Sequence, residues 1–151
     1  MTVQGLSRLN RKLKVLPELA RKEIAKAMEE SAGEIVRMAK SLVPVDDGQL
    51  RDSIGWTWGD APRGSITLGT VGKSGNMRIT VYAGDERAFY ARWVEFGTRS
   101  HAQGGMFAGT QHPGTPAQPF FYPAYRATRK RAKGRVTRAI NKAAKRAAAA
   151  G

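Results

Sequence analysis

The 151-residue chain has no cysteine, no long apolar run and, after Glu95, no acidic residue. The absence of cysteine excludes disulfides and thiolate metal or redox chemistry, and it fits assembly in the cytosol. No stretch approaches the roughly 20 apolar residues that span a bilayer. The segment after Met1 is polar and basic, so we expect neither a membrane span nor a secretory signal.

The missing acidic residues leave the last third of the chain strongly basic. Residues 1–40 hold nine basic and five acidic side chains, residues 41–95 hold six and seven, and residues 96–151 hold eleven and none. The net charge of +14 therefore comes mainly from this last third. Such a block is typical of contact with nucleic acid, an acidic protein or an anionic membrane, and charge alone does not choose among them.

Hydrophobic periodicity predicts helices at the start and a sheet in the middle. Leucines spaced three and four apart predict a short helix over residues 5–16. A longer apolar stripe, from Ala20 to Leu42, predicts an amphipathic helix of about 25 residues that begins near Pro17. Alternation over residues 53–58, 65–71 and 77–83 predicts three strands joined by hairpin loops. We expect one α+β domain over residues 1–151, with the N-terminal helices in 1–43 and an antiparallel β-meander in 53–83, covered on one face by helices.

An aromatic helix is predicted over residues 88–97. Phe89, Trp93 and Phe96 lie at i, i+4 and i+7, and therefore on one helical face, which we expect to plug the core. Gly97 is placed for a left-handed cap. Residues 98–118 are rich in glycine and proline, so we expect a flexible loop that becomes ordered on contact with a partner.

A long basic helix is predicted over residues 119–150. Pro119 opens it and three aromatic side chains anchor it. Its apolar stripe is mostly alanine, which buries little area at ~25 cal/mol per Å². We therefore expect its distal half to fray or to dock onto another chain.

Candidates for chemistry are few. His101 and His112 are two potential metal ligands, and a zinc site needs three or four. Glu95 has no evident base or nucleophile beside it, so we favour a structural ion pair over general acid catalysis. The acidic residues near position 47 lack the spacing of a calcium loop, and residues 72–75 lack the first glycine of a P-loop. We expect no enzyme activity, no cofactor and no metal.

Several motifs in order resemble one known family. They are Gly5, Leu6 and Leu9; Pro44, Gly48, Leu50, Arg51, Ser53 and Ile54; Tyr90, Ala91, Val94, Glu95, Phe96, Gly97 and Thr98; and Ala117, Pro119, Phe120, Pro123 and Ala124. This set is similar to the tail-completion (head–tail neck) proteins of long-tailed bacteriophages, of the lambda-like coliphage type. The glycine-rich segment 104–114 makes the loop longer than the usual pattern.

The resemblance implies a structural virion protein that completes the tail and joins it to the head connector. It implies a homo-oligomeric ring, with six subunits expected, assembled in the host cytoplasm. The implied partners are the tail-tube, tail-terminator and head-connector or stopper proteins; the terminator ring itself is an alternative identity. We expect interface residues in the aromatic helix, the loop and the start of the last helix: Trp93, Glu95, Phe96, Arg99, His101, Met106, Phe107, Phe120, Phe121 and Tyr125.

Two other functions compete with this one. The last helix would contact phosphates or an acidic partner through Arg126, Arg129, Lys130, Arg131, Lys133, Arg135 and Arg138. Its charges lie all round the helix and no aromatic residue follows Tyr125, so DNA contact without base recognition is the most it predicts. A membrane-surface helix is disfavoured, because the apolar face is alanine.

Overall fold

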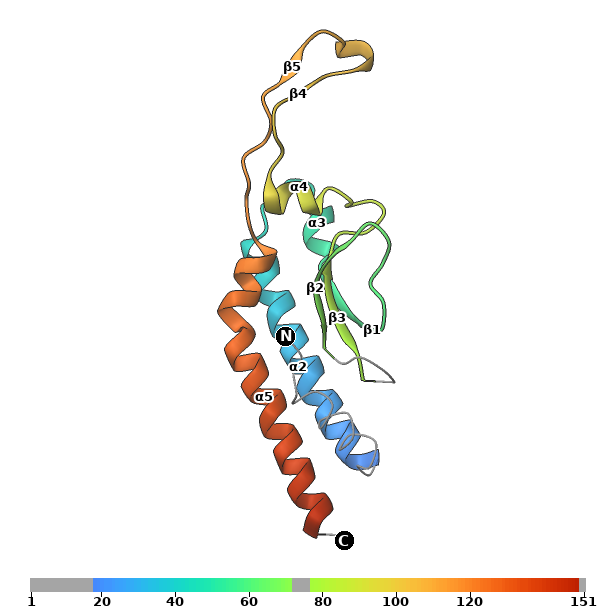
Figure 1. Cartoon of the computed structure of the whole chain (residues 1–151), viewed down its shortest axis with the longest axis vertical. Helices are drawn as coiled ribbons and strands as arrows, with labels where there is room; N and C mark the ends of the chain where they lie inside the picture. The colour runs from blue at the N-terminus through green and yellow to red at the C-terminus, as the bar shows by residue number, and fades with distance from the viewer. Residues whose placement is uncertain (1–17, 72–76, 150–151) are drawn as a thin grey trace, which may run out of the picture.

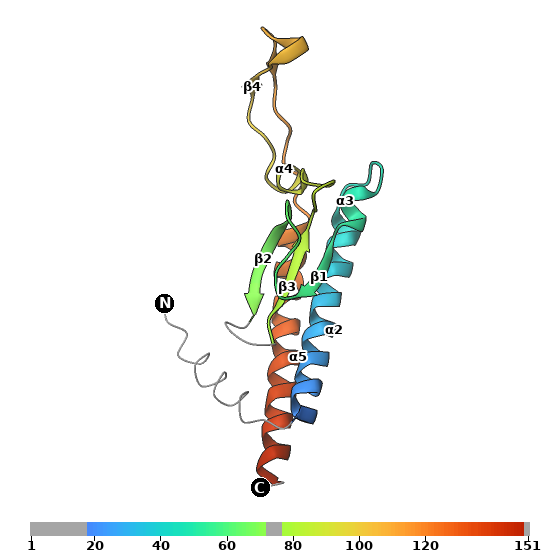
Figure 2. The same ribbon diagram turned by 90° about the vertical axis from the view of Figure 1, so that its right-hand side faces the viewer.

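The computed structural model describes residues 18–71 and 77–149, which form two long helices, a small sheet and a projecting arm (Figure 1). The helix predicted over residues 5–16 lies outside the described residues. Helices α2 (Glu18–Leu42) and α5 (Phe121–Ala149) run antiparallel, side by side, and the sheet lies against them in both ribbon views (Figures 1 and 2). The predicted α+β class is confirmed.

Helix α2 has the predicted position and its 25 residues. Glu18 in its first turn and Lys40 in its last complement the helix dipole. Leu42 was predicted to lie inside but is 46% exposed, because the buried stripe continues to Val43 instead. Pro44 follows at once and cannot extend the helix. The buried stripe consists of Ala20, Ile24, Ala27, Met28, Ser31, Ala32, Ile35, Ala39 and Val43.

The antiparallel sheet contains β1 (Gly55–Trp58), β2 (Ile66–Val71) and β3 (Ile79–Ala83). Its order is β1-β3-β2, so the predicted meander is wrong: β1 and β2 both pair with β3 and not with each other. The loop after β1 is therefore not a hairpin. It stays attached to β3, where Gly59 N donates to Arg78 O at 2.9 Å and Thr80 Oγ1 donates to Gly59 O at 2.6 Å. Turn composition predicts a loop, but it does not predict which strand the flanking segments pair with.

The core lies between the sheet, α2 and the start of α5. Trp56 and Trp58 of β1 pack against the core, with ring centroids 6.5 Å apart. Trp58 Nε1 also donates to Glu29 Oε1 of α2 at 3.0 Å. Phe120 and Phe121 are fully buried and are the largest such side chains among the described residues. The predicted aromatic anchor of the last helix thus provides the centre of the core.

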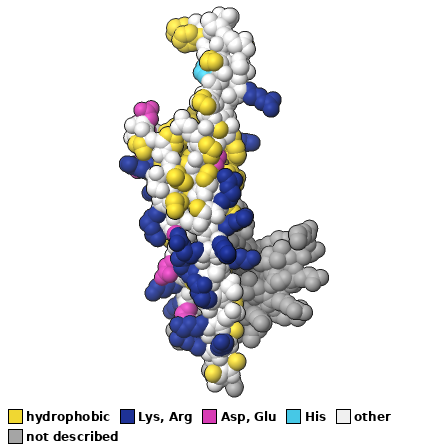
Figure 3. Space-filling view, turned by 90° about the vertical axis from the view of Figure 1, so that its left-hand side faces the viewer, with side chains coloured by type: hydrophobic (Ala, Val, Ile, Leu, Met, Phe, Trp, Pro, Cys, Tyr) yellow, Lys and Arg dark blue, Asp and Glu magenta, His cyan; other side chains and the backbone are white. Residues whose placement is uncertain are grey.

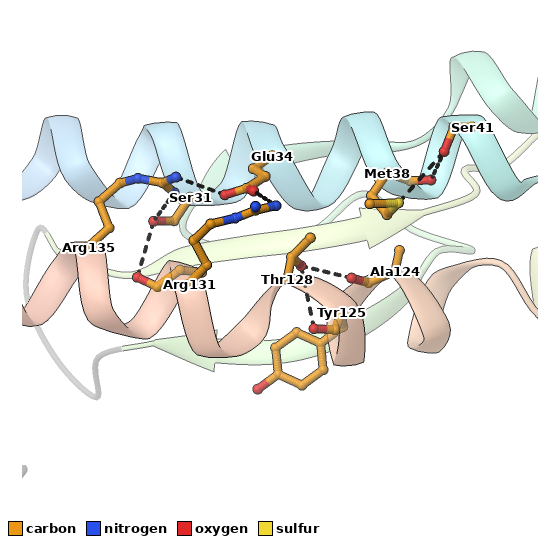
Figure 4. A network of polar contacts seen from close by, with 10 residues as sticks. Ser31, Glu34, Met38, Ser41, Ala124, Tyr125, Thr128, Arg131 and Arg135 are labelled. Carbon is orange, nitrogen blue, oxygen red and sulfur yellow. Dashed lines mark hydrogen bonds and ion pairs between the residues drawn. The ribbon is translucent and has the colours of Figure 1, made fainter.

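The distal half of α5 is held by α2 of the same chain, which corrects the expectation that it frays or needs another chain. Small residues on both helices allow close approach, and a polar network bridges them (Figure 4). Glu34 pairs with Arg131 and, at 2.9 Å, with Arg135, and Arg135 also donates to Ser31 Oγ at 3.1 Å. A further ion pair joins Arg146 to α2. The estimate from the alanine stripe counted only apolar area. It therefore left out the ion pairs and hydrogen bonds that join α5 to α2.

The pKa of the Glu34 carboxyl group is lowered in the folded chain. The hydrogen bond from Arg135, with the nearby Arg131, holds the pKa of Glu34 below its usual value against the opposing effect of burial. The folded helix pair therefore favours the ionised carboxylate.

Candidate assembly surfaces

Helix α4 (Ala91–Phe96) turns its aromatic side chains outward. Phe89, Trp93 and Phe96 are 54%, 50% and 58% exposed, so the prediction that they plug the core is wrong. Ala91 and Glu95 are the buried residues of this helix. The i, i+4, i+7 spacing identified a common face but not which face is buried. We call Phe89, Trp93 and Phe96 the aromatic face.

Glu95 is buried because it caps α5. Its Oε2 accepts hydrogen bonds from the N–H groups of Phe120 at 2.8 Å and Phe121 at 2.9 Å, and its Oε1 accepts from Tyr122 N–H at 3.0 Å. A carboxylate at a helix N-terminus satisfies unpaired N–H groups and complements the helix dipole. The predicted ion pair is therefore replaced by a helix cap. Since Glu95, Phe120 and Phe121 are at most 3% exposed, they lie inside the chain and offer no surface to a partner.

Residues 98–118 form a projecting arm rather than the predicted flexible loop. Strands β4 (His101–Ala102) and β5 (Gln111–His112) pair antiparallel, and a bridge joins Thr98 to Thr115 nearer the body. The rings of His101 and His112 stack across the arm with centroids 5.1 Å apart. Main-chain pairing therefore orders this segment without a partner, although its composition is typical of a loop.

The tip of the arm presents two large apolar side chains to solvent. A 3₁₀ turn, η1 (Gly105–Phe107), leaves Met106 96% exposed and Phe107 64% exposed. Thr110 fixes this turn, because its N–H and its Oγ1 both donate to Phe107 O, at 3.1 and 2.7 Å. Large apolar groups held in a defined turn away from the core are typical of a contact site.

A hollow lies where the arm leaves the body. It has a volume of about 260 Å³, and its lining is Pro44, Val45, Asp46, Asp47, Gly48, Leu50, Arg51, Tyr90, Val94, Thr115, Pro116 and Gln118. Burial raises the pKa of the Tyr90 hydroxyl, and the charges of Asp47 and Asp46 add to this effect. The hollow is thus mainly apolar with carboxylates among its lining.

The basic residues of α5 divide into two groups. Arg131 and Arg135 form ion pairs with Glu34, so they are not the free cations that the predicted phosphate contacts require. The second group is exposed, and within the described part of the chain its members form no ion pair: Arg126, Arg129, Lys130, Lys133 and Arg138. Figure 3 shows on one face that hydrophobic side chains gather in the upper body and at the arm tip, while most of the Lys and Arg side chains lie over the lower half.

The structure therefore gathers the predicted site residues into separate places. Trp93 and Phe96 belong to the aromatic face, and Arg99, His101, Met106 and Phe107 to the arm, all of them exposed. Tyr125 is half-buried against the core. Sequence reasoning missed Val45 and the carboxylates of the hollow; the available signal was an apolar residue, Val45, between Pro44 and two aspartates in a turn.

Exposed apolar surfaces at the end of a small domain are typical of a protein that functions within an assembly. A family model described as "Bacteriophage HK97-gp10, putative tail-component" matches residues 7–97, more than half of the chain. The chain therefore belongs to this HK97-gp10-like family of phage tail components, which confirms the resemblance found in the sequence. The match ends at Gly97, so the arm and α5 lie beyond it.

No curated protein and no solved structure gives a significant match. Among the described residues, no helix is both long enough and apolar enough to cross a bilayer.

Proposed function

We propose that this phage tail component assembles as a ring, with six subunits expected, that completes the tail and joins it to the head connector. It acts as a structural protein without catalysis, in the host cytoplasm before assembly and in the neck of the virion afterwards. The tail-tube, tail-terminator and connector or stopper proteins are its partners, and a terminator ring is the alternative position in the tail.

One observation carries this proposal. The chain buries small residues along its helix pair but leaves its aromatic face and arm tip outside, at the same end of the molecule. A monomer gains nothing from exposing Trp93, Phe96 and Phe107 together, whereas a subunit in a ring covers such side chains with its neighbours. Family membership supports the same conclusion, since a tail is built from repeated copies of its components.

The test is the native mass of the purified protein, alone and mixed with its tail-tube and terminator proteins. We expect a ring or a mixed complex. Trp93→Glu should abolish the complex while far-UV circular dichroism stays unchanged. Arg92→Glu, at the exposed neighbouring position, is the matched control and should leave assembly intact. A wild-type protein that stays monomeric in every mixture would contradict the proposal.

A second candidate function rests on five exposed basic residues of α5 that have no acidic partner in the described chain, namely Arg126, Arg129, Lys130, Lys133 and Arg138. In a ring, these side chains would contact DNA phosphates without recognising sequence. Five phosphate contacts predict that affinity falls by about 500-fold between roughly 50 and 200 mM salt. A DNA affinity that does not change with salt concentration would rule out this phosphate contact, and it would not affect the ring proposal.

A further inference from the structure

We infer that the arm tip of one copy inserts into the hollow of a neighbouring copy, so that Met106 and Phe107 form the contact that links successive subunits. This inference rests on the proposed ring, and it names the two surfaces that join its members. The donor surface is the tip, and the acceptor surface is the hollow at the base of the neighbour's arm.

The tip has the properties of an inserting group. It projects from the body, and both of its large apolar side chains are exposed, Met106 at 96% and Phe107 at 64%. Hydrogen bonds order it in advance: Gln103 N–H donates to Thr110 O at 2.9 Å, and Ala108 N–H donates to Gly105 O at 3.1 Å. Insertion therefore orders little additional chain, which lowers the entropic cost of association.

The hollow has the properties of a receptor for side chains. Its volume of about 260 Å³ is below the ~300–1,000 Å³ typical of small-molecule sites. Its apolar walls come from Pro44, Val45, Leu50 and Val94. A pocket of this size and lining fits the end of one or two large side chains better than a ligand.

Charge favours this pairing. Asp46 and Asp47 are exposed beside the hollow, and no ion pair joins either of them to another described residue. Residues 98–118 contain one arginine, two histidines and no acidic side chain. The arm can therefore lie against these carboxylates without like-charge repulsion, whereas an arm with acidic residues would be repelled.

The tip cannot reach the hollow of its own chain. Thr115 and Pro116, at the base of the arm, line that hollow. The pairs Thr98–Thr115 and His101–His112 keep the two halves of the arm together and carry the tip away from its base (Figure 1). An arm tip that fills the hollow must therefore come from another copy.

The reach of the arm suits a ring. Gly105 lies seven positions after Thr98, which corresponds to ~23 Å of extended chain. This length is comparable to the ~30 Å diameter of a small domain. An arm that reaches one neighbour, while the hollow receives another, makes a head-to-tail contact. Such contacts generate a closed ring when the rotation between copies closes, and an open filament when it does not.

Because the chain contains no cysteine, paired substitutions test the contact directly. Met106→Cys carrying a mass tag is mixed with untagged Val45→Cys, and the mixture is oxidised or treated with a short bis-maleimide. We expect a mixed covalent dimer. The double variant Met106→Cys/Val45→Cys should give a ladder of linked chains that ends at the ring size found by native mass.

Two control pairs place the acceptor. Met106→Cys with Thr137→Cys, an exposed position on α5, should give no specific product. Met106→Cys with Trp93→Cys tests the aromatic face as the acceptor. Linkage to Trp93→Cys without linkage to Val45→Cys would overturn the inference.

A second measurement does not depend on cross-linking geometry. Met106→Ser/Phe107→Ser should shift the native mass from ring to monomer with unchanged circular dichroism, while Ala108→Ser at the same tip should keep the ring. The inference fails, and the ring proposal stands, if three results occur together: the wild type forms a ring, the serine double variant also forms it, and no linkage to Val45→Cys appears. If the wild type forms no ring or complex, the proposed function fails instead.

Discussion

Replacing Glu95 with alanine is expected to destabilise the whole chain, because one side chain caps the helix that forms the core. Its two carboxylate oxygens accept hydrogen bonds from three N–H groups, at 2.8, 2.9 and 3.0 Å, the first two buried and the third partly buried. A hydrogen bond to a charged group contributes about 1.5–3 kcal/mol, and an ordinary N-cap about 1 kcal/mol. Since the three bonds share one acceptor group, their losses do not simply add, and we expect a total loss of about 3–5 kcal/mol.

The assay is urea and thermal unfolding followed by far-UV circular dichroism. Against a typical stability of about 5–15 kcal/mol, the loss is large, and the melting temperature should fall by roughly 6–20 °C. Glu95→Gln keeps one acceptor oxygen, but its NH₂ group would face the remaining N–H groups, so we expect a loss of about 2–3 kcal/mol in the free energy of unfolding. Glu30→Ala, exposed on α2, is the control and should change stability by less than about 0.5 kcal/mol. A Glu95→Ala protein within about 1 kcal/mol of wild type would refute the capping argument.

Three further predictions concern the helix pair, the hollow and the base of the arm. Arg135 lowers the pKa of Glu34 in the folded chain. The stability that this contact adds is present above the usual pKa of about 4.5 and should be lost as pH falls through the lower folded pKa. Urea unfolding across a pH series should show a smaller loss for Glu34→Gln than for wild type. Burial raises the pKa of Tyr90, so stability present below about pH 10 should be lost as pH rises through the higher folded pKa; an alkaline unfolding series in which Tyr90→Phe loses as much as wild type would count against this. Gly97→Ala should cost about 3 kcal/mol or more, because φ is 71° and the added Cβ would lie 2.7 Å from a carbonyl oxygen of the arm. Gly109→Ala, where φ is 91° but nothing lies within 4 Å, should cost only about 1–2 kcal/mol, and equal losses in thermal unfolding would reject the steric argument.

The sequence predicted those elements whose pattern is local. The apolar stripe of α2 specified its ends, because Pro17 and Pro44 stand beside them and the 3.6-residue period is sustained between. The alternation over β3 identified the strand but only part of its burial, because Thr80, on the face expected to be polar, is buried together with Ile79 and Val81. Local periodicity was sufficient where an element packs by one continuous face.

Prediction failed where burial is decided by a distant segment. The aromatic face was assigned to the core because large rings are usually buried, yet Phe120 and Phe121 already fill that space. The role of Glu95 depended on the first turn of α5, 25 residues further along the chain. The hollow was invisible for the same reason, since its walls come from three separated segments that no single window contains.

The arm is closed at its base before either half of it leaves the body. The main chains of Thr98 and Thr115 exchange two hydrogen bonds, and Gln118 N–H donates to Val94 O at 2.8 Å. These bonds hold the end of α4 close to the segment that leads into α5, whatever the length of the arm between them. Doubling the length of a closed excursion costs only about 0.6 kcal/mol. The length and sequence of the segment beyond this pairing can thus change at little cost to folding, so contacts made during assembly constrain the arm more than the stability of the body does.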